Sequence, residues 1–256
     1  MAHQFYFGTG NLFITPNSAN PTPINVAAIQ NVSVDFDGDT KQMFGQLSFA
    51  LDTARGKTKV TGKFEVGQIN AGLWNAVFFG LSGAGAQGVT TGQTLYAYNE
   101  GPTAIPTTPF QITVANAAHF SQDLGCYNSA TGIPFQRVAS GPTAGQYSVN
   151  TSTGVYTFSS ADNVSAISVV FNYEYTASAT GQNLPVVNTL MGNIPVFRLD
   201  LTNQTKGKNS VLQLYACTSS KLQFPFKQDD YGMQTFDFSV QDDGTGRILN
   251  WATTEG

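Results

Sequence analysis

The chain has 256 residues, enough for one large β domain or for one domain that carries a smaller one. Hydrophobic residues make up 41% of it, which allows a buried core and excludes a disordered chain, and the net charge of −4 argues against a protein that holds nucleic acid through clustered lysines and arginines. Charged residues make up only 11%, and because charge keeps surfaces apart, so low a content indicates surface that is buried between subunits.

The N-terminal segment and the cysteines indicate synthesis in a bacterial cytoplasm. Residues 1–5 show no basic segment followed by an apolar stretch, so we expect no signal peptide. The longest apolar run, near residues 73–81, is interrupted by Asn75 and is too short to cross a bilayer, so we expect no membrane insertion. Cys126 and Cys217 lie far apart in the sequence, and we expect both to be buried free thiols of a reducing compartment.

Alternation of apolar and polar residues dominates the sequence and predicts strands that place one face on a core. The sets expected to face the core are Val32, Val34 and Phe36; Leu47, Phe49 and Leu51; Phe197, Leu199 and Leu201; and Phe236, Phe238 and Val240. The polar residues between them are expected to face solvent or a partner.

Residues 68–80 break this alternation and predict a helix of about three turns. Asn70 is the expected N-cap, and Gly80 is expected to take the left-handed conformation just beyond the C-terminus of the helix. The apolar residues that recur at four-residue spacing, and so are expected to share one face, are Ile69, Leu73 and Val77. We expect this to be the one convincing helix of the chain.

Two stretches rich in Gly, Ala and Thr, at residues 80–92 and 176–183, delimit a second β-rich segment. Within this segment, residues 150–154 form a turn signal between two short alternating runs and predict a hairpin. A longer alternating strand follows and includes Tyr175. An inserted β-sandwich would carry this pattern, and so would an elaborated hairpin packed on the parent sheet.

The expected fold class is therefore all-β with one short flanking helix. The expected main domain is a β-barrel or sandwich made of residues 1–87 and 183–256, and residues 88–182 are expected to form a small inserted β-sandwich.

Three motif matches are better explained by β structure than by ligand binding. Residues 83–88 satisfy the dinucleotide pattern G-x-G-x-x-G, but a predicted helix precedes them and a β segment follows, which reverses the required order. Residues 55–58 resemble the end of a phosphate-binding loop, but Leu51 replaces its first glycine and a strand pattern follows, so we expect a turn between two strands. Residues 35–39 resemble part of a calcium loop with its glycine misplaced, so we expect an acidic strand end there, with adventitious cation binding left open.

The sequence offers little catalytic machinery. Its histidines are His3 and His119, neither cysteine has an evident base beside it, and no zinc-ligand spacing occurs. We therefore predict no catalytic, cofactor-binding or metal-binding residues, no cofactor, and a protein that is not an enzyme. A glycosidase that uses two distant carboxylates has no fixed sequence spacing and stays open.

Four cations share parity along one predicted strand and are expected to point to the same side: Arg55, Lys57, Lys59 and Lys63. Such a row is typical of a solvated edge whose lysines block unwanted strand pairing. It would also suit contact with acidic side chains of a neighbouring subunit, which makes these residues inter-subunit contact candidates, and direct contact with DNA is a third interpretation.

Several segments resemble a family of bacteriophage virion structural proteins, the major tail or tail tube proteins. They are Phe44-Gly45-Gln46, residues 54–63, residues 72–80, Asp123-Leu124-Gly125, residues 145–149, residues 154–158, Leu190-Met191-Gly192 and residues 216–222. Together they span most of the chain from about residue 30 onward. The resemblance is more specific for a virion protein than for its place in the virion, because tube, terminator and baseplate-hub proteins share this β fold.

The resemblance implies a tail-tube-type β domain whose main partner is another copy of itself. Copies would form hexameric rings whose strands join into one barrel, and the rings would stack into a tube. Other implied partners are the tape measure and terminator proteins, with phage DNA passing through without specific binding, and the implied location is the phage tail after synthesis in the host cytoplasm. A lumen that lets a polyanion slide favours acidic or neutral side chains, and the candidates are Asp35, Asp37, Asp200 and Asp237. The inserted module would lie on the outer surface.

Two other functions stay open at this point. One is a different virion component, such as a terminator, hub or decoration protein. The other is a carbohydrate-binding β-sandwich that uses Tyr96, Tyr98 or Tyr127 as stacking platforms.

Overall fold

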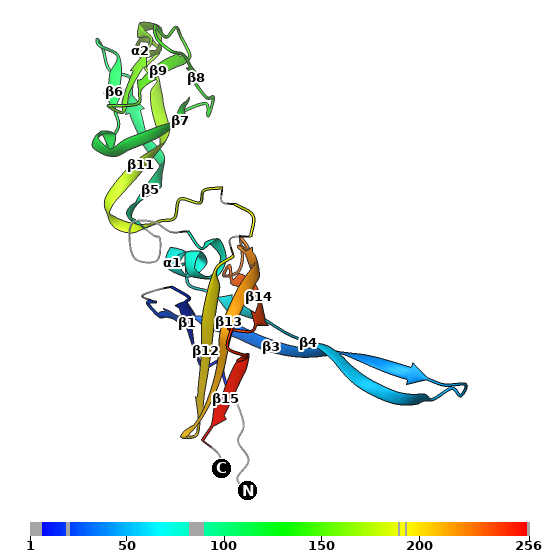
Figure 1. The fold of residues 1–256 in the computed structure, drawn as a ribbon. Coiled ribbons are helices and arrows are strands. Elements are labelled where there is room, and N and C mark those ends of the chain that lie inside the picture. The colour runs from blue at the N-terminus through cyan, green and yellow to red at the C-terminus, as the bar shows by residue number, and fades with distance from the viewer. Residues whose placement is uncertain (1–6, 19–20, 82–89, 189, 193, 255–256) are drawn as a thin grey trace. The chain divides into compact units, whose positions relative to one another are not determined.

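The computed structural model describes residues 7–18, 21–81, 90–188, 190–192 and 194–254, and most of these lie in β-strands (Figure 1). The expected all-β fold class is thereby confirmed. The chain divides into two compact units. Unit 1 comprises residues 1–90 and 184–256, and unit 2 comprises residues 91–183.

Unit 1 contains one antiparallel sheet of eight strands. The strands are β1 (Asn11–Pro16), β2 (Ile24–Val26), β3 (Ile29–Phe44), β4 (Ala50–Val66), β12 (Val196–Thr205), β13 (Lys208–Gln223), β14 (Gln234–Gln241) and β15 (Leu249–Thr253). Their order is β2-β1-β12-β13-β14-β4-β3, and β15 also pairs with β13. Because this path ends at β2 and at β3, the described part of one chain does not close the barrel that the sequence led us to expect.

One face of this sheet carries the core of unit 1. Phe64 of β4 stacks on Phe236 of β14 with ring centroids 4.7 Å apart, and Phe238 packs beside them. Alternate residues of β12, including Leu199, are buried in the same cluster. Two of the predicted core-facing sets, in residues 197–201 and 236–240, are thus confirmed.

The predicted core-facing set Leu47, Phe49 and Leu51 is wrong. Residues 45–49 form the turn between β3 and β4, and all three apolar side chains are exposed. A strand that packs on a core and an exposed apolar hairpin tip can show the same alternation of apolar and polar residues. The sequence pattern alone therefore does not distinguish the two cases.

The predicted helix is present and short. It consists of α1 (Ala71–Trp74), which continues as a π-helix over Asn75–Phe79. The side chain of Asn70 caps it by accepting a 3.1 Å hydrogen bond from the backbone N–H of Leu73, and Gly80 ends it at φ +62°. Leu73 and Val77 are buried against the sheet, but Ile69 precedes the cap and is 75% exposed, so it does not share their face.

Unit 2 contains two small sheets, with strand orders β6-β10-β9-β8 and β5-β11-β7. The strands are β5 (Thr90–Ala104), β6 (Gln111–Thr113), β7 (Phe120–Asn128), β8 (Gln136–Arg137), β9 (Gln146–Asn150), β10 (Val155–Phe158) and β11 (Ser168–Asn183). The predicted hairpin at residues 150–154 joins β9 to β10. Two short helices that the sequence did not predict also occur, a 3-10 turn at Ala117–His119 and α2 (Ser160–Val164).

The two sheets of unit 2 share one core, which contains a buried carboxylate. Tyr156 of β10 and Phe171 of β11 pack edge to face inside it. Asp123 of β7 accepts hydrogen bonds from the hydroxyls of Tyr147, at 2.8 Å, and Tyr156, at 2.7 Å, and Arg137 lies 3.4 Å from it. Burial and the bond to Asp123 raise the pKa of both tyrosines, so they remain hydrogen-bond donors.

Candidate assembly surfaces

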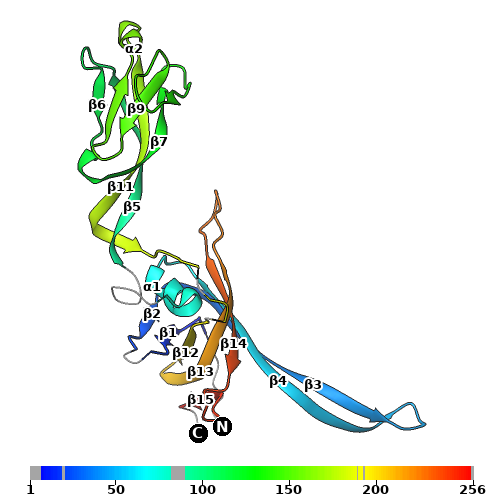
Figure 2. The ribbon, with the colours of Figure 1, turned by 45° about the horizontal axis from the view of Figure 1, so that its top comes forward.

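The hairpin of β3 and β4, here called the arm, extends away from the rest of unit 1 (Figures 1 and 2). The two strands pair from Ile29 opposite Val66 to Phe44 opposite Ala50. Every residue from 39 to 59 except Ala50 is exposed, so both faces of the outer arm meet solvent. Because a two-stranded ribbon is at best marginally stable in water, cover by another protein surface would stabilise an arm of this length.

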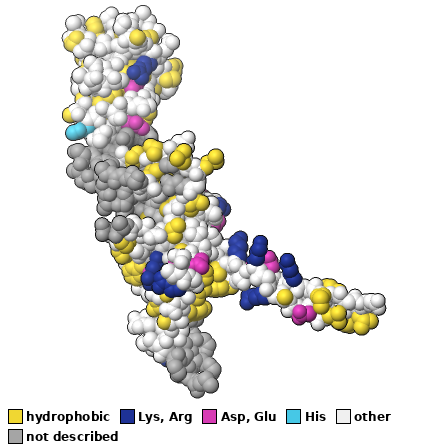
Figure 3. All heavy atoms as spheres, in the orientation of Figure 1, with side chains coloured by type: hydrophobic (Ala, Val, Ile, Leu, Met, Phe, Trp, Pro, Cys, Tyr) yellow, Lys and Arg dark blue, Asp and Glu magenta, His cyan; other side chains and the backbone are white. Residues whose placement is uncertain are grey.

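The arm ends in an apolar tip, defined by Met43, Phe44, Leu47, Phe49 and Leu51. These five side chains are 57–83% exposed, and they gather at the end of the arm in Figure 3. Contiguous exposed apolar surface of this kind marks a site of protein contact. The tip is therefore the strongest candidate contact surface in unit 1.

The four predicted cations do not lie on one face of the arm. Gly38 pairs with Thr58 and Thr40 pairs with Arg55, so Gly56 and Lys57 together oppose a single residue of β3. This is a β-bulge, which reverses the alternation of β4. As a result Arg55 points to the face opposite Lys59.

Gly38 accommodates the displaced Arg55 side chain. A Cβ built at Gly38 would lie 2.7 Å from Nε of Arg55, so the guanidinium lies in the space beside this glycine, and a larger residue there would require the Arg55 side chain to move. The predicted single row of four cations is thus corrected: Lys59 and Lys63 share one face, Arg55 lies on the other, and Lys57 lies in the bulge itself, opposite Asp39. Gly56 lies in the bulge, opposite Asp39, and Gly38 pairs with Thr58 beside it, so glycines on both strands are the sequence signal for the bulge.

The acidic candidates lie on the same side of the sheet as this lysine pair. Asp37 pairs in register with Lys59, and Asp237 pairs with Lys63, and cross-strand partners point the same way. Asp35 is two residues from Asp37 on the same strand and shares its face. We call this side, opposite the core, the outer face of unit 1.

Cations accompany acids over the rest of the outer face as well. Asp200 lies between two core-facing leucines and points outward, where it accepts hydrogen bonds of 2.9 and 3.1 Å from Nε of Arg198. Lys221 lies 3.9 Å from Asp237. The hydrogen bond from Lys63 to Glu65, with Nζ and the carboxylate 2.7 Å apart, raises the pKa of Lys63. The outer face is therefore one of mixed charge, which differs from the acidic face that the four aspartates suggest by themselves.

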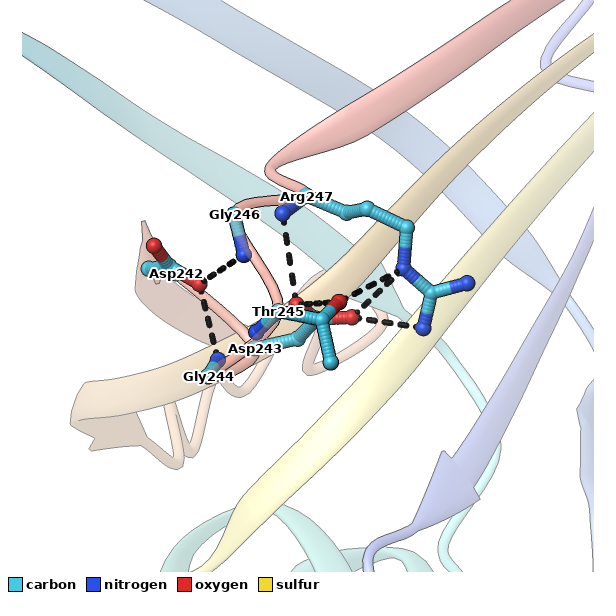
Figure 4. A network of polar contacts seen from close by, with 6 residues as sticks. All are labelled: Asp242, Asp243, Gly244, Thr245, Gly246 and Arg247. Atoms are coloured by element: carbon cyan, nitrogen blue, oxygen red, sulfur yellow. Dashed lines mark hydrogen bonds and ion pairs between the residues drawn. The ribbon is translucent and has the colours of Figure 1, made fainter.

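The turn between β14 and β15 is fixed by its own side chains (Figure 4). Asp242 accepts hydrogen bonds from the backbone N–H groups of Gly244, at 2.7 Å, and Gly246, at 2.9 Å. Asp243 accepts bonds from the hydroxyl of Thr245, at 2.6 Å, and from Nε of Arg247, at 2.8 Å. The bond from the Thr245 hydroxyl is the main reason why the pKa of Asp243 lies well below its usual range.

This turn holds a cation against an aromatic ring. The guanidinium of Arg247 lies 4.6 Å from the ring centre of Tyr215, and that of Arg198 lies 5.5 Å from it. Each arginine also pairs with an aspartate, Asp243 or Asp200. Asp243 is engaged by Arg247 and by backbone N–H groups, and Asp200 by Arg198, so the side chains hold this turn in a fixed shape.

The motifs weighed in the sequence fall in regular structure where they are described. Residues 35–39 lie within β3, and residues 55–58 lie within β4 at the bulge, where a turn was predicted; the turn itself is at residues 45–49. Over the described ranges, three or more His, Cys, Asp or Glu side chains never gather in a way that could hold a metal ion. The G-x-G-x-x-G match at residues 83–88 lies outside the described residues.

The three tyrosines proposed for carbohydrate stacking lie in unit 2. Tyr127 of β7 is half-buried, and its backbone forms an isolated antiparallel bridge with that of Pro134. The side chains of Tyr96 and Tyr98 lie outside the described residues.

Comparison with known proteins identifies no relative. No protein-family model matches the chain, and a search of curated proteins finds no similar sequence. Within the described ranges, no helix has the length and apolar character needed to cross a membrane.

Proposed function

We propose that this chain is a structural subunit of a bacteriophage tail tube. In this proposal, copies assemble into stacked hexameric rings whose lumen conducts the genome during ejection. The observation that carries the proposal is the arm, a long two-stranded ribbon that is exposed on both faces and ends in five exposed apolar side chains. Such a ribbon gains stability when another protein covers it.

The strand order supports self-assembly in the same way. The sheet of unit 1 ends at β3 and at β2, and unpaired strand edges are templates for pairing with another chain. When the sheets of neighbouring copies join around a ring, these strand edges become paired. The assembly then has a fixed number of copies and does not grow into an unlimited aggregate. The segments that resemble tail tube proteins include residues 54–63 of the arm and residues 72–80 of the helix.

The outer face suits a lumen that lets DNA slide. Its aspartates, including Asp200 and Asp237, are accompanied by cations at close range, so little net charge remains to hold a polyanion. In this proposal Asp35, Asp37, Asp200 and Asp237 face the lumen. The protein acts without catalysis or cofactor, and its partners are further copies and the tape measure and terminator proteins of the virion.

The test is assembly of the purified protein, followed by size-exclusion chromatography and negative-stain electron microscopy. We expect rings or tubes of uniform bore from the wild-type chain. A small discrete oligomer without stacking would favour a terminator, hub or decoration protein instead, and a permanent monomer would contradict the proposal.

A matched pair of double variants tests the role of the tip. Leu47→Ser/Phe49→Ser removes two exposed apolar side chains from the tip, whereas Leu124→Ser/Ile133→Ser removes two exposed ones from unit 2. We expect the tip variant to lose tubes and the unit 2 variant to keep them. Equal assembly of both would show that the tip takes no part.

A further inference from the structure

An apolar hollow of about 430 Å³ lies on the core-facing side of the unit 1 sheet, apart from the tip. Its apolar walls come from four strands and consist of Val32, Val34 and Phe36 of β3, Leu201 of β12, Leu212 of β13 and Trp251 of β15. All these residues are on the side that carries the core, because Trp251 pairs with the buried Leu212, and Val32 pairs with the buried Phe64.

The mouth of the hollow carries two exposed aromatic side chains, and polar residues also line the hollow, namely Thr9, Asn31, Asn203 and Ser210. Phe36 is 50% exposed and Trp251 is 53% exposed, although the residues behind them belong to or pack on the core. Indole Nε1 of Trp251 donates a 2.9 Å hydrogen bond to the hydroxyl of Ser210, which holds the ring at the mouth. The apolar residues of the hollow are thus continuous with the core of unit 1 and reach the surface at Phe36 and Trp251.

The arm of the same chain cannot fill this hollow. Phe36 lines the mouth, and Phe44 at the base of the tip lies eight residues farther along the same strand. At about 3.3 Å per residue, an extended strand places the two roughly 26 Å apart, and the paired β4 prevents β3 from folding back. An apolar tip that enters the hollow must come from another chain.

We infer that this hollow receives the apolar tip of the arm of a second copy, an inference that rests on the proposed self-assembly of the chain. The two surfaces match in chemistry, because the five tip side chains are apolar and six apolar side chains line the hollow alongside its polar ones. They also match in size, since about 430 Å³ accommodates a few large side chains such as Leu47 and Phe49 but not the whole hairpin. Every copy carries both the tip and the hollow, so copies of this one chain are sufficient to form the contact.

The position of the two surfaces fixes the kind of assembly. Because the tip and the hollow are different patches, the contact is head-to-tail. Each copy that donates its tip still has a free hollow, so the same contact can repeat from copy to copy. The stretch of arm between them sets the offset between joined copies, which is roughly 26 Å along the arm. Such a contact closes into a ring or continues as an open stack, according to the rotation between joined copies, and the proposed tube uses both kinds of contact.

The test is cross-linking between two differently tagged single-cysteine variants in assembled protein. One chain carries Leu47→Cys at the tip, and the other carries Phe36→Cys at the mouth of the hollow. The matched control is Asp35→Cys, the neighbouring position on β3 that points to the outer face. The native Cys126 and Cys217 are buried and do not compete for a short bismaleimide.

We expect a two-chain adduct from Leu47→Cys with Phe36→Cys and its loss with Asp35→Cys. If rings or tubes form but the adduct is absent, or is as strong with Asp35→Cys, the inference is overturned and the proposed function stands. The same holds if the tip cross-links only to another tail protein. If the wild-type chain never assembles, both the inference and the proposed function are overturned. A monomeric Leu47→Ser/Phe49→Ser variant that adds to preformed wild-type tubes at the end where tips are presented, and at no other, would support the inference independently.

Discussion

Gly62 shows how a single absent side chain shapes the core of unit 1. It lies on the core face of β4, in the same alternation as the buried residues Val60 and Phe64. The ring of Phe238 from the neighbouring strand occupies the space above it. A Cβ built at Gly62 would overlap Cζ of Phe238 and would lie 2.6 Å from the carbonyl oxygen of Ser33. The glycine is therefore required by close packing and not by a turn.

We predict that Gly62→Ala lowers the free energy of unfolding by about 1–3 kcal/mol, because Phe238 and the backbone of β3 must both move. Urea unfolding followed by near-UV circular dichroism measures the change. Gly56→Ala is the matched control on the same strand, since its added Cβ would make ordinary contacts at 3.5 and 3.6 Å. Equal loss of stability in the two variants would contradict this account of Gly62.

Asp243 gives the turn between β14 and β15 a defined response to acid. The hydrogen bond from the Thr245 hydroxyl is the largest cause that lowers the pKa of Asp243 in the folded chain. The stability that ionised Asp243 contributes to the turn is therefore fully present above the unfolded pKa of about 4. That contribution is lost as the pH falls through the lower folded pKa. We expect the amide of Thr245, which donates to Asp243 at 2.9 Å, to stay protected from hydrogen exchange at pH 4 to 7 and to lose protection in stronger acid.

The variant Asp243→Asn is the control for this pH response, since its amide does not titrate. Its Thr245 amide should exchange at the same relative rate throughout the acid range, once the intrinsic pH dependence of exchange is subtracted. A wild-type profile identical to that of the variant would show that Asp243 does not hold the turn.

At the scale of elements, the arm is exposed in the single chain and is expected to be covered in the assembly. It carries four trypsin sites in exposed positions, Lys41, Arg55, Lys57 and Lys59. An exposed two-stranded ribbon opens readily, because few buried contacts hold it. Arg198 of β12, by contrast, is half-buried within the sheet and hydrogen-bonded to Asp200.

We predict that brief trypsin digestion of the monomer cuts first within residues 41–59 and that assembly protects these sites. Mass spectrometry of the fragments locates the cuts and gives their order. Cleavage at the same arm sites and rates in assembled protein would mean that no neighbouring copy covers the arm.

At the scale of the whole molecule, the two units have separate cores. The core of unit 1 is formed by residues from β1 to α1 and from β12 to β15, and that of unit 2 by residues 105–173. Within unit 2, β5 and β11 are neighbours in one sheet, and the chain enters through the first and leaves through the second. The insertion therefore begins and ends on adjacent strands, which makes it separable.

We predict that residues 91–183 fold when produced alone, and that replacing them by a short Gly-Ser linker leaves unit 1 able to assemble. Dispersed amide chemical shifts and cooperative thermal unfolding measure the first, and electron microscopy of the shortened chain measures the second. A shortened chain that is folded but remains monomeric would place unit 2 in the assembly contacts and contradict its role as an outer module.

Much of the fold followed from local patterns in the sequence. The strands at residues 197–201 and 236–240, the hairpin at 150–154 and the capped helix after Asn70 were predicted because alternation, turn residues and caps act over a few neighbouring positions. The mixed charge of the outer face was not predicted, because Asp237 meets Lys63 and Lys221 only through strand pairing. The same is true of the carboxylate of Asp123 and its two tyrosines in unit 2.

The sequence by itself determined that this chain is an all-β protein and that a capped helix follows Asn70, because side-chain periodicity and capping residues act over a few neighbouring positions. It left open what each apolar face meets. Only the tertiary structure decided that Phe36 lines a hollow and that Leu47 and Phe49 end an arm in solvent, since both depend on where β3 and β4 leave the sheet. The bulge opposite Asp39, which turns Arg55 away from Lys59, was likewise decided by pairing between strands, because register is a property of two segments and not of one.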